Sequence, residues 1–207
     1  MQKGLFITFE GPDGSGKTTQ INCLKAYLEE QGFEALLTRE PGGTSISEKI
    51  REIILDKGNE EMDSLTEAFL YASARAQLVA QVIGPALARG KTVICDRFVD
   101  SSIVYQGYGR GLGDCVRVIN DIAVQGVRPD VTFFLRLAPQ KGKSRIKAEE
   151  QDRMERESLA FHDRVFEGYE ELARQEPRRF IPIDGDRSVE AVAADIRSHM
   201  ERLLDKH

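Results

Sequence analysis

The stretch from Gly11 to Thr18 limits the possible folds of this chain more than any other feature of the sequence. It has the sequence Gly-Pro-Asp-Gly-Ser-Gly-Lys-Thr and lies between an apolar run and a helical pattern. This matches Gly-x-x-x-x-Gly-Lys-[Ser/Thr], the P-loop, in the strand–loop–helix context that it requires. The glycines let successive backbone N–H groups converge on phosphate oxygens, and the helix N-terminus adds its positive end.

The motif predicts a role for each of its residues. Lys17 is expected to reach the β- and γ-phosphates of a nucleotide, and the Thr18 hydroxyl is expected to take a place on Mg²⁺. The alternative, a glycine-rich turn without a ligand, does not require a strand and a helix on its two sides. The residues predicted to contact ATP are Gly11, Pro12, Asp13, Gly14, Ser15, Gly16, Lys17, Thr18 and Thr19.

Short apolar runs alternate with longer helical patterns along the chain. Runs without clean polar alternation are typical of strands that are buried on both faces. The predicted strands are Leu5–Glu10, Ala35–Thr38, Thr92–Cys95, Val131–Leu137 and Phe180–Ile183. The predicted helices begin near Gly16 and after Ser45, and then cover Ser64–Arg89, Cys115–Gln125, Ser158–Arg174 and Ser188–Leu204. Pro85 is expected to bend or shorten the last turns of the long third helix.

This alternation predicts an α/β fold of the P-loop NTPase type. Strand and helix in turn imply a three-layer sandwich, in which a five-stranded parallel sheet is flanked by helices on both faces. No repeat or linker interrupts the pattern, so residues 1–207 are expected to form a single domain. Ligands of such sheets bind beyond the carboxyl ends of the strands.

Composition excludes several other classes of protein. The formal net charge of -5 argues against a general nucleic-acid binder, which needs Lys and Arg to neutralise phosphates. Three widely spaced cysteines suit neither a disulfide framework nor a zinc site, and we expect them to be buried free thiols. No apolar run approaches the length of a membrane span, and the first ten residues do not resemble a signal peptide. We therefore expect a cytoplasmic protein that does not bind a membrane.

A P-loop alone is shared by GTPases, transport ATPases and kinases. A guanine-binding Asn-Lys-x-Asp is absent, because none of the asparagines Asn22, Asn59 and Asn120 is followed by Lys. The sequence Leu-Ser-Gly-Gly-Gln of ABC-type ATPases is absent as well. The remaining feature is a supply of arginines at strand ends, which favours a kinase with an anionic acceptor.

The end of the third strand carries Asp96 and Arg97. A carboxylate beside a P-loop can hold the hydration shell of Mg²⁺, and a guanidinium can clamp the phosphate of an acceptor. The alternative is a structural ion pair between the two residues. Arg51 follows the second strand on the next helix, where by itself it is better explained as a solvated residue.

Tyr71 and Arg75 are four residues apart, so they share one face of the long helix. A ring can stack on a nucleobase while a guanidinium donates to a carbonyl on the edge of the base. Thymine has an acceptor at O4, whereas cytosine has a donor at N4, so this arginine would discriminate between them. The alternative is a core tyrosine with Arg75 stacked over it.

Five motifs together resemble bacterial thymidylate kinases. They are Gly-Pro-Asp-Gly-Ser-Gly-Lys-Thr, Arg-Glu-Pro-Gly-Gly-Thr, Ala-Ser-Ala-Arg-Ala-Gln, Asp-Arg-Phe-x-x-Ser-Ser-x-x-Tyr-Gln-Gly and Arg-Pro-Asp-x-Thr, in the order of that family and over residues 5 to 184. The resemblance implies a homodimeric enzyme that phosphorylates thymidine monophosphate (dTMP) to the diphosphate with ATP and Mg²⁺.

The resemblance further implies an acceptor site. Asp13 would contact the sugar hydroxyl and a phosphate-binding arginine, and Arg51 and Arg97 would hold the acceptor phosphate. Tyr71, where the family usually has Phe, would stack on thymine, and Tyr105 would disfavour ribonucleotides. The residues implied in dTMP binding are Asp13, Glu40, Arg51, Tyr71, Arg75, Arg97, Ser102, Tyr105 and Gln106.

The charged run Arg136–Glu157 follows the fourth strand. Such a run is usually a solvated face, but at this position it can form a lid over ATP, about residues 138–157. The family supplies a catalytic cation either from a P-loop arginine or from the lid, and Gly14 stands where the former would be. We therefore predict a lid arginine, Arg153 first and Arg145 second, beside Lys17, Arg97 and Asp13 as catalytic residues.

Two other functions remain open from the sequence. A kinase for another nucleoside monophosphate or for a deoxynucleoside would share the P-loop, and a nucleoside acceptor would need a base to take a hydroxyl proton. A nucleotide-dependent switch would hydrolyse slowly and need no acceptor.

Overall fold

The computed structural model describes residues 4–145 and 151–204. It contains one parallel sheet, in the order β2-β3-β1-β4-β5. The strands are β1 (Phe6–Glu10), β2 (Ala35–Arg39), β3 (Thr92–Asp96), β4 (Val131–Arg136) and β5 (Phe180–Asp184). All five predicted strands are confirmed, with ends that shift by one residue.

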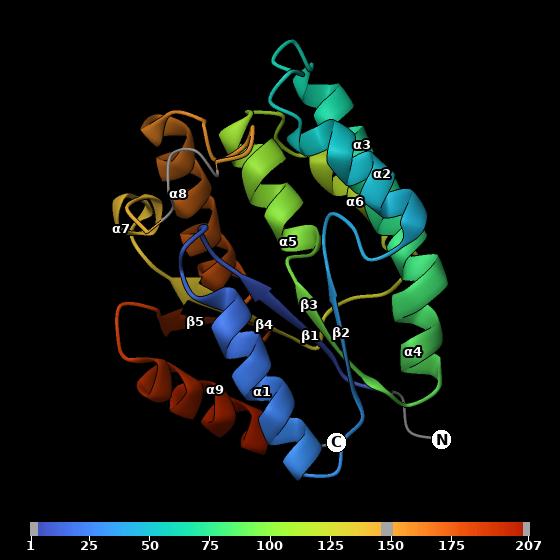
Figure 1. Ribbon diagram of the computed structural model, residues 1–207, viewed down its shortest axis with the longest axis vertical. Coiled ribbons are helices and arrows are strands. Elements are labelled where there is room, and N and C mark those ends of the chain that lie inside the picture. Colours follow the sequence, from blue (N-terminus) through green and yellow to red (C-terminus); the bar gives the residue numbers. More distant parts are fainter. Residues whose placement is uncertain (1–3, 146–150, 205–207) are drawn as a thin grey trace.

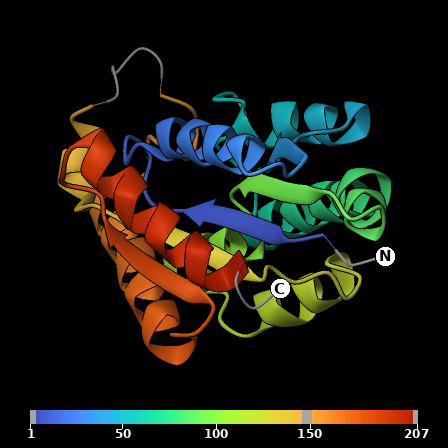
Figure 2. The same ribbon diagram turned by 90° about the horizontal axis from the view of Figure 1, so that it is seen from below.

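Alternate strand residues pack into two separate cores, which makes the fold a three-layer sandwich (Figures 1 and 2). On one face Ile7 and Phe133 pack with α1 (Lys17–Glu30) and α9 (Val189–Leu204). On the other face Phe6 and Phe134 pack with the remaining long helices. These are α3 (Ser64–Leu78) and α8 (Leu159–Gln175), with α2 (Ser45–Leu55) and α6 (Cys115–Ala123) packed against α3. The predicted P-loop NTPase architecture is therefore confirmed.

The long third helix is interrupted before Pro85. α3 ends at Leu78, a π-helical turn η1 (Val79–Ile83) follows, and α4 (Gly84–Ala88) begins with Pro85 in its first turn. A proline lacks the N–H group that a continuous α-helix needs, and the π turn accommodates that loss. The long helix therefore changes type before Pro85, and the predicted bend stays a prediction.

Three short helical segments were not predicted from the sequence. The segments α5 (Val99–Ser102) and η2 (Ile103–Gly109) follow β3, and α7 (Pro139–Lys143) follows β4. The first is an α-helix of only four residues and the second is π-helical, so neither has the 3.6-residue apolar period of a longer helix. All three begin close to the carboxyl end of a strand, where a ligand of this fold would bind.

Two composition-based expectations can be compared with the described residues. Cys95 is buried, but Cys23 is half-buried and Cys115 is exposed, so the expectation of three buried thiols is wrong for two of them. All three are free thiols, as expected. In the described part of the chain, no helix has the length and apolarity that crossing a membrane requires.

Candidate active site

The loop between β1 and α1 surrounds the amino group of Lys17. Lys17 Nζ donates to the carbonyl oxygens of Gly11 and Pro12, both at 3.1 Å. Burial, reinforced by the nearby Arg97, lowers the pKa of this amine. In this arrangement the cation is held over the loop, where it can move to a nucleotide phosphate.

The P-loop contacts the helix α7 through two glycines. Gly14 has a φ of 76°, and a Cβ there would lie 2.5 Å from the carbonyl oxygen of Gly142. A Cβ on Gly142 would in turn lie 2.4 Å from the carbonyl oxygen of Asp13. The left-handed backbone and this close approach give a physical reason why position 14 carries no arginine.

Arg97 follows β3 in the left-handed region, with a φ of 66°. Its Nη2 donates to Asp13 Oδ1 at 2.6 Å, and its guanidinium carbon lies 5.2 Å from the centre of the Tyr105 ring. Although burial alone would raise it, the pKa of Asp13 is lowered by Arg97 and Lys17. The predicted alternative of an Asp96–Arg97 ion pair is not what the structure shows, because Arg97 pairs with Asp13.

The buried carboxylate of Glu10 holds the residues around Arg97. Glu10 accepts hydrogen bonds from the backbone N–H of Phe98 at 2.8 Å and from the hydroxyls of Ser101 at 2.6 Å and Tyr169 at 2.7 Å. Arg97 Nη1 lies 3.3 Å from both of those hydroxyl oxygens. Burial raises the pKa of Glu10, and the nearby Asp100 raises it further. Glu10 ends an apolar strand and Tyr169 lies in an amphipathic helix, so neither carries a sequence signal for this site.

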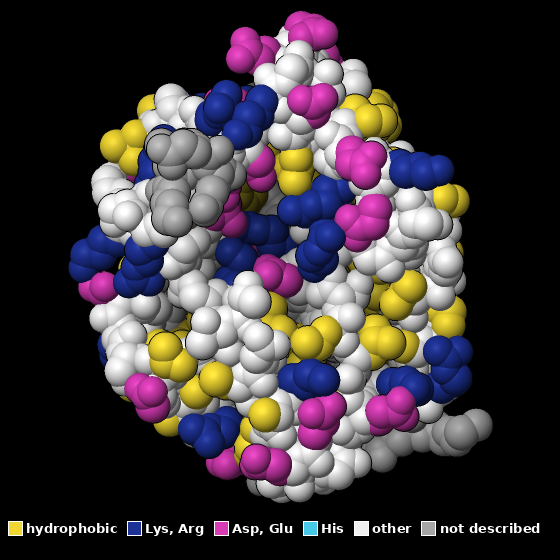
Figure 3. Space-filling view, in the orientation of Figure 1, with side chains coloured by type: hydrophobic (Ala, Val, Ile, Leu, Met, Phe, Trp, Pro, Cys, Tyr) yellow, Lys and Arg dark blue, Asp and Glu magenta, His cyan; other side chains and the backbone are white. Residues whose placement is uncertain are grey.

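A cleft beyond the strand ends contains two adjoining cavities. The phosphate cavity is lined by the P-loop, Asp96 and Arg97, and the acceptor cavity by residues of α2, α3, α5 and η2. Asp13, Glu40, Arg51, Arg97 and Glu155 line both cavities. Figure 3 shows Lys and Arg side chains gathered in a hollow near the centre of this face of the molecule. The acceptor cavity is also lined by Tyr71, Arg75, Ser102, Tyr105 and Gln106, together with Asp152 and Met154 of the predicted lid.

The structure thus brings every predicted dTMP-binding residue to one cavity. Arg51 and Arg39 both donate to the carbonyl oxygen of Pro41, at 3.0 and 2.8 Å. Burial lowers the pKa of the Arg51 guanidinium, and the neighbouring Arg39 acts in the same direction. Such a cation, desolvated and beside another cation, is well suited to an anionic ligand.

All three nitrogens of the Arg75 guanidinium have partners inside the protein. Arg75 contacts Glu40 through Nε at 2.8 Å and through Nη2 at 2.6 Å. Nη1 donates to Asn120 and, at 3.0 Å, to Ser102, and Nη2 donates to the carbonyl oxygen of Phe98 at 3.0 Å. The guanidinium lies over the ring of Phe98, not over Tyr71 as the alternative interpretation held. A base carbonyl could bond to Arg75 only by replacing one of these partners.

Gln106 has a free acceptor in the same region. Its Nε2 donates to Glu67 Oε1 at 2.9 Å, while its Oε1 is buried and has no hydrogen-bond partner among the described residues. Buried polar atoms of proteins are nearly always paired, so such an atom requires an explanation. A donor on a bound ligand would provide one. Glu67 was not identified from the sequence, since a glutamate in a helix is usually solvated.

The structure places the two candidate lid arginines differently. Arg145 Nη1 donates to the carbonyl oxygen of Gly14 at 3.0 Å and therefore lies on the P-loop. Arg153 is buried, donates to Glu67 at 2.7 Å and to the carbonyl oxygen of Ile54 at 2.7 Å, and lines neither the phosphate nor the acceptor cavity. Of the two, Arg145 is therefore the one that lies on the P-loop, and the catalytic role of a lid arginine stays a prediction. Lid residues 146–150 lie outside the described residues.

Comparisons with known proteins agree with this geometry. The family model described as Thymidylate kinase matches residues 9–196. The thymidylate kinase of Bacillus pumilus is 49% identical over 208 residues, which cover 99% of this chain and 98% of that protein. The thymidylate kinase of Thermoanaerobacter sp. is 51% identical over 203 residues, which cover 98% of this chain and 100% of that protein.

A solved structure has the same fold. The crystal structure of thymidylate kinase from Ehrlichia chaffeensis superposes with a TM-score of 0.79 at 33% sequence identity, covering 96% of this chain and 99% of that chain. The family model and the relatives extend over the P-loop, the acceptor cavity and the helices between them. This chain belongs to the thymidylate kinase family.

Proposed function

We propose that this protein transfers the γ-phosphoryl group of ATP to dTMP, with Mg²⁺, to form dTDP for deoxythymidine nucleotide synthesis. One observation supports this above all others. The phosphate cavity and the acceptor cavity share a wall made of Asp13, Arg97 and Arg51, so the phosphates of two nucleotides would meet there. Phosphoryl transfer depends mainly on in-line positioning and on positive charge around the transferring group.

The donor side would bind ATP through the backbone N–H groups of residues 11–19. Lys17 would leave the carbonyl oxygens of Gly11 and Pro12 and move to the β- and γ-phosphates. Arg145, which lies on the P-loop at Gly14, would place its charge on the transferring phosphoryl oxygens. We assign Arg153 a structural role in attaching the lid segment to α2 and α3.

The residues of this chain fit a hydrated Mg²⁺ ion. Asp96 Oδ1 is buried at the end of β3 and has no hydrogen-bond partner among the described residues, which suits an acceptor for metal-bound water. Asp96 lines the same cavity as Thr18, whose hydroxyl would be a direct ligand. When bound, the ion neutralises charge on the β- and γ-phosphates.

The acceptor side would hold dTMP by its phosphate, its sugar and its base. Arg97 and Arg51 would bind the phosphate, and Tyr105 would pack on the 2′ carbon and disfavour ribonucleotides. Tyr71 would stack on thymine. Gln106 and Ser102 would contact the edge of the base. Arg75 would hold Glu40 and Ser102 in place, and would reach O4 only by exchanging a partner.

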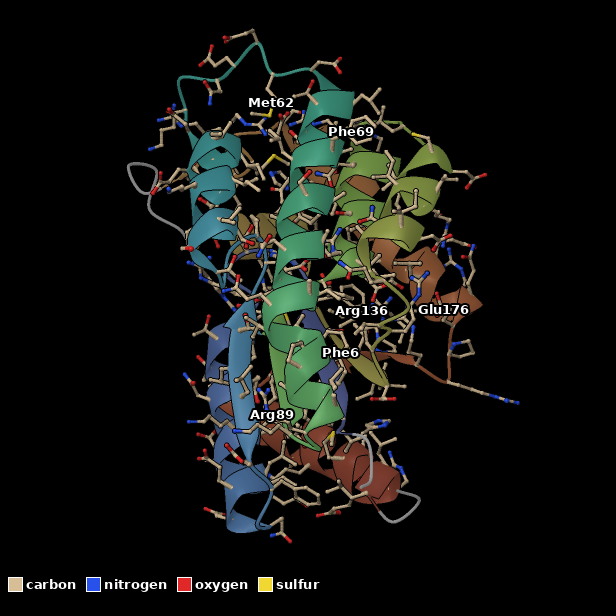
Figure 4. All side chains as sticks on the ribbon, turned by 90° about the vertical axis from the view of Figure 1, so that its right-hand side faces the viewer. Phe6, Met62, Phe69, Arg89, Arg136 and Glu176 are labelled. Carbon is tan, nitrogen blue, oxygen red and sulfur yellow. The ribbon has the colours of Figure 1, made fainter. Side chains whose placement is uncertain are left out.

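We propose a cytoplasmic homodimer that acts on nucleotides alone, without nucleic acid or a membrane as partner. Residues 1–207 would form one domain, with a lid at about 138–157. Neighbouring helices α3 and α6 support the dimer, because each exposes large apolar side chains, such as Phe69 and Ile122. Figure 4 shows these two helices side by side, with Phe69 labelled on α3.

A panel of acceptors tests the proposed function. ATP and Mg²⁺ are supplied with dTMP, dUMP, dCMP, dAMP, dGMP or thymidine, and diphosphate and ADP formation are measured. We expect the highest kcat/KM with dTMP and no turnover of thymidine, since thymidine lacks the phosphate that Arg51 and Arg97 would bind. A better rate with dCMP or with thymidine would contradict the proposal.

A further inference from the structure

The buried carboxylate of Glu67 joins three parts of the molecule. Glu67 lies on α3 and is 1% exposed. Its Oε1 accepts from Gln106 Nε2 at 2.9 Å and from Arg110 Nε at 3.2 Å. Its Oε2 accepts from Arg110 Nη2 at 2.9 Å and from Arg153 Nη2 at 2.7 Å. Every donor comes from the acceptor-site helix η2, from the residue directly after it, or from the lid segment.

These contacts keep the carboxylate ionised. Burial alone would raise its pKa, but the hydrogen bonds from Arg110 and Gln106 lower it. An ionised carboxylate has no proton to donate, so it can only accept hydrogen bonds. Gln106 must therefore turn its NH₂ group toward Glu67, which leaves its carbonyl oxygen on the opposite side of the amide.

That carbonyl oxygen is the buried Oε1 atom without a hydrogen-bond partner among the described residues. Gln106 lines the acceptor cavity together with Arg75 and Ser102. The N3–H group of thymine or uracil is a donor that could satisfy this oxygen. Cytosine has a lone pair at N3 instead, so two acceptors would face each other.

We propose that Glu67 is a positioning residue for base selection. By accepting from Nε2, it fixes the amide of Gln106 so that the carbonyl oxygen selects an imide base edge and rejects cytosine. This inference rests on the proposed function, because it concerns the base of the acceptor nucleotide. It places the origin of selectivity in a residue that does not line the acceptor cavity.

The two oxygens of Glu67 separate this role from attachment of the lid. Gln106 binds Oε1, whereas Arg153 binds Oε2 and also donates to the carbonyl oxygen of Ile54. The variant Arg153→Met removes a cation from Oε2 and leaves the contact between Glu67 and Gln106 in place. It is therefore a matched control, which weakens the lid attachment without releasing the amide.

The test is the variant Glu67→Gln, assayed with dTMP, dUMP and dCMP. An amide at position 67 can donate as well as accept, so Gln106 can take either orientation. We expect the ratio of kcat/KM for dTMP to that for dCMP to fall by about 10- to 100-fold, within the ~10⁴–10⁵-fold that a hydrogen-bonding site can supply. The ratio for dTMP to dUMP should not change, since these bases share N3–H and O4. Arg153→Met should leave both ratios at their wild-type values.

A second variant removes the selecting oxygen directly and keeps the test independent of the folding of Glu67→Gln. Gln106→Met should lower kcat/KM for dTMP and dUMP more than for dCMP. In that background, Glu67→Gln should change the dTMP to dCMP ratio no further. An unchanged ratio in Gln106→Met, or equal losses for all three substrates in Glu67→Gln, would overturn the inference.

The outcomes also distinguish this inference from the proposed function. If the wild-type enzyme prefers dTMP and both variants keep that preference, the roles of Glu67 and Gln106 in base selection are wrong, and the proposed function stands. If the wild-type enzyme phosphorylates none of the three substrates, the proposed function fails, and base selection by Glu67 fails with it.

Discussion

At the scale of single residues, the proposed acceptor phosphate site depends on side chains that do not themselves line it. Arg97 has an unfavourable left-handed backbone, which persists only where the surroundings determine it. Its backbone N–H donates to the carbonyl oxygen of Phe9 at 2.9 Å, and the Glu10 network fixes the residues that follow it. The position of the guanidinium is therefore set before any ligand binds, which lowers the cost of ordering it.

The variant Tyr169→Phe tests this preorganisation. It removes one hydroxyl from Glu10 and Arg97 but keeps the ring, which stacks on Phe134 at a centroid distance of 4.8 Å. A hydrogen bond to a charged group contributes roughly 1.5–3 kcal/mol, so kcat/KM for dTMP should fall by about 10- to 100-fold. KM for ATP should stay close to the wild-type value. Tyr108→Phe is the control, because that hydroxyl is on the same helical segment, η2, as the acceptor residues but is partly exposed. An equal rise in KM for both substrates would contradict a role confined to the acceptor side.

Substitutions of Arg145 and of Arg153 should have different effects on kinetics and stability. Arg145→Met should lower kcat by about 10³-fold or less, because an arginine that acts on the transferring group stabilises the transition state more than the ground state. Arg153→Met should instead lower the free energy of unfolding by up to about 3 kcal/mol, because it breaks the buried ion pair with Glu67. The loss is limited because the Glu67 carboxylate keeps its ion pair with Arg110. Steady-state kinetics, calorimetric ATP affinity and thermal unfolding of both variants are the measurements. A normal kcat in Arg145→Met, together with a large loss of kcat in Arg153→Met, would instead support Arg153 as the catalytic arginine.

At the scale of elements, the lid is joined to the P-loop by the contact between α7 and the loop backbone. Gly14 and Gly142 permit this approach, and a side chain at either position would separate the two segments. The same contact brings Arg145, two residues after the end of α7, onto the carbonyl oxygen of Gly14. The lack of a side chain at position 14 and the contact of Arg145 with the P-loop thus both follow from one packing arrangement.

The variant Gly142→Ala tests that arrangement. Its Cβ would meet the carbonyl oxygen of Asp13 at 2.4 Å, so α7 must move away from the P-loop. A misplacement of about 1 Å near the reacting groups can cost ~10²-fold, so we expect a fall of about 10- to 100-fold in kcat/KM for ATP. Gly58→Ala is the control, because the nearest atom to its Cβ is a side-chain oxygen of Asp56 at 3.3 Å. ATP kinetics equal to the wild type would show that the lid is not positioned through this contact.

At the scale of the whole molecule, sequence patterns predicted the sheet and the long helices because buried strands and amphipathic helices have clear periods. They missed α5 and η2, since a four-residue helix followed by a π-helical segment has no such period. The resemblance to thymidylate kinases, not a pattern, implied that Gln106 lies in the acceptor cavity, whereas Glu67 and Glu10 look like ordinary charged residues in the sequence. The sequence of the lid segment also does not show which carboxylate or carbonyl group Arg145 and Arg153 each contact.

The exposed apolar side chains of α3 and α6 lead to a prediction about assembly. Leu65 and Phe69 on α3, and Val118 and Ile122 on α6, are pairs four residues apart, so each pair lies along one face of its helix. Clustered exposed apolar residues on neighbouring helices are typical of an interface, and a symmetric dimer would bury the same patch on both copies. Ile122 is the most exposed large apolar residue of the described chain, at 77%.

The variant Ile122→Glu should therefore convert a dimer into a monomer. A charge at this position would have to be desolvated in the interface, which is costly without a partner of opposite charge. Val189→Glu, on α9 at the opposite face of the sheet and 45% exposed, is the matched control. Sedimentation velocity at several concentrations should give twice the chain mass for the wild type and for Val189→Glu, and the single-chain mass for Ile122→Glu. A monomeric wild type would contradict the proposed dimer, and a dimeric Ile122→Glu would show that α6 is not part of the interface.

The same variant tests whether the dimer supports the acceptor site. Because α3 also carries Tyr71, Arg75 and Glu67, loss of the dimer should raise KM for dTMP more than KM for ATP.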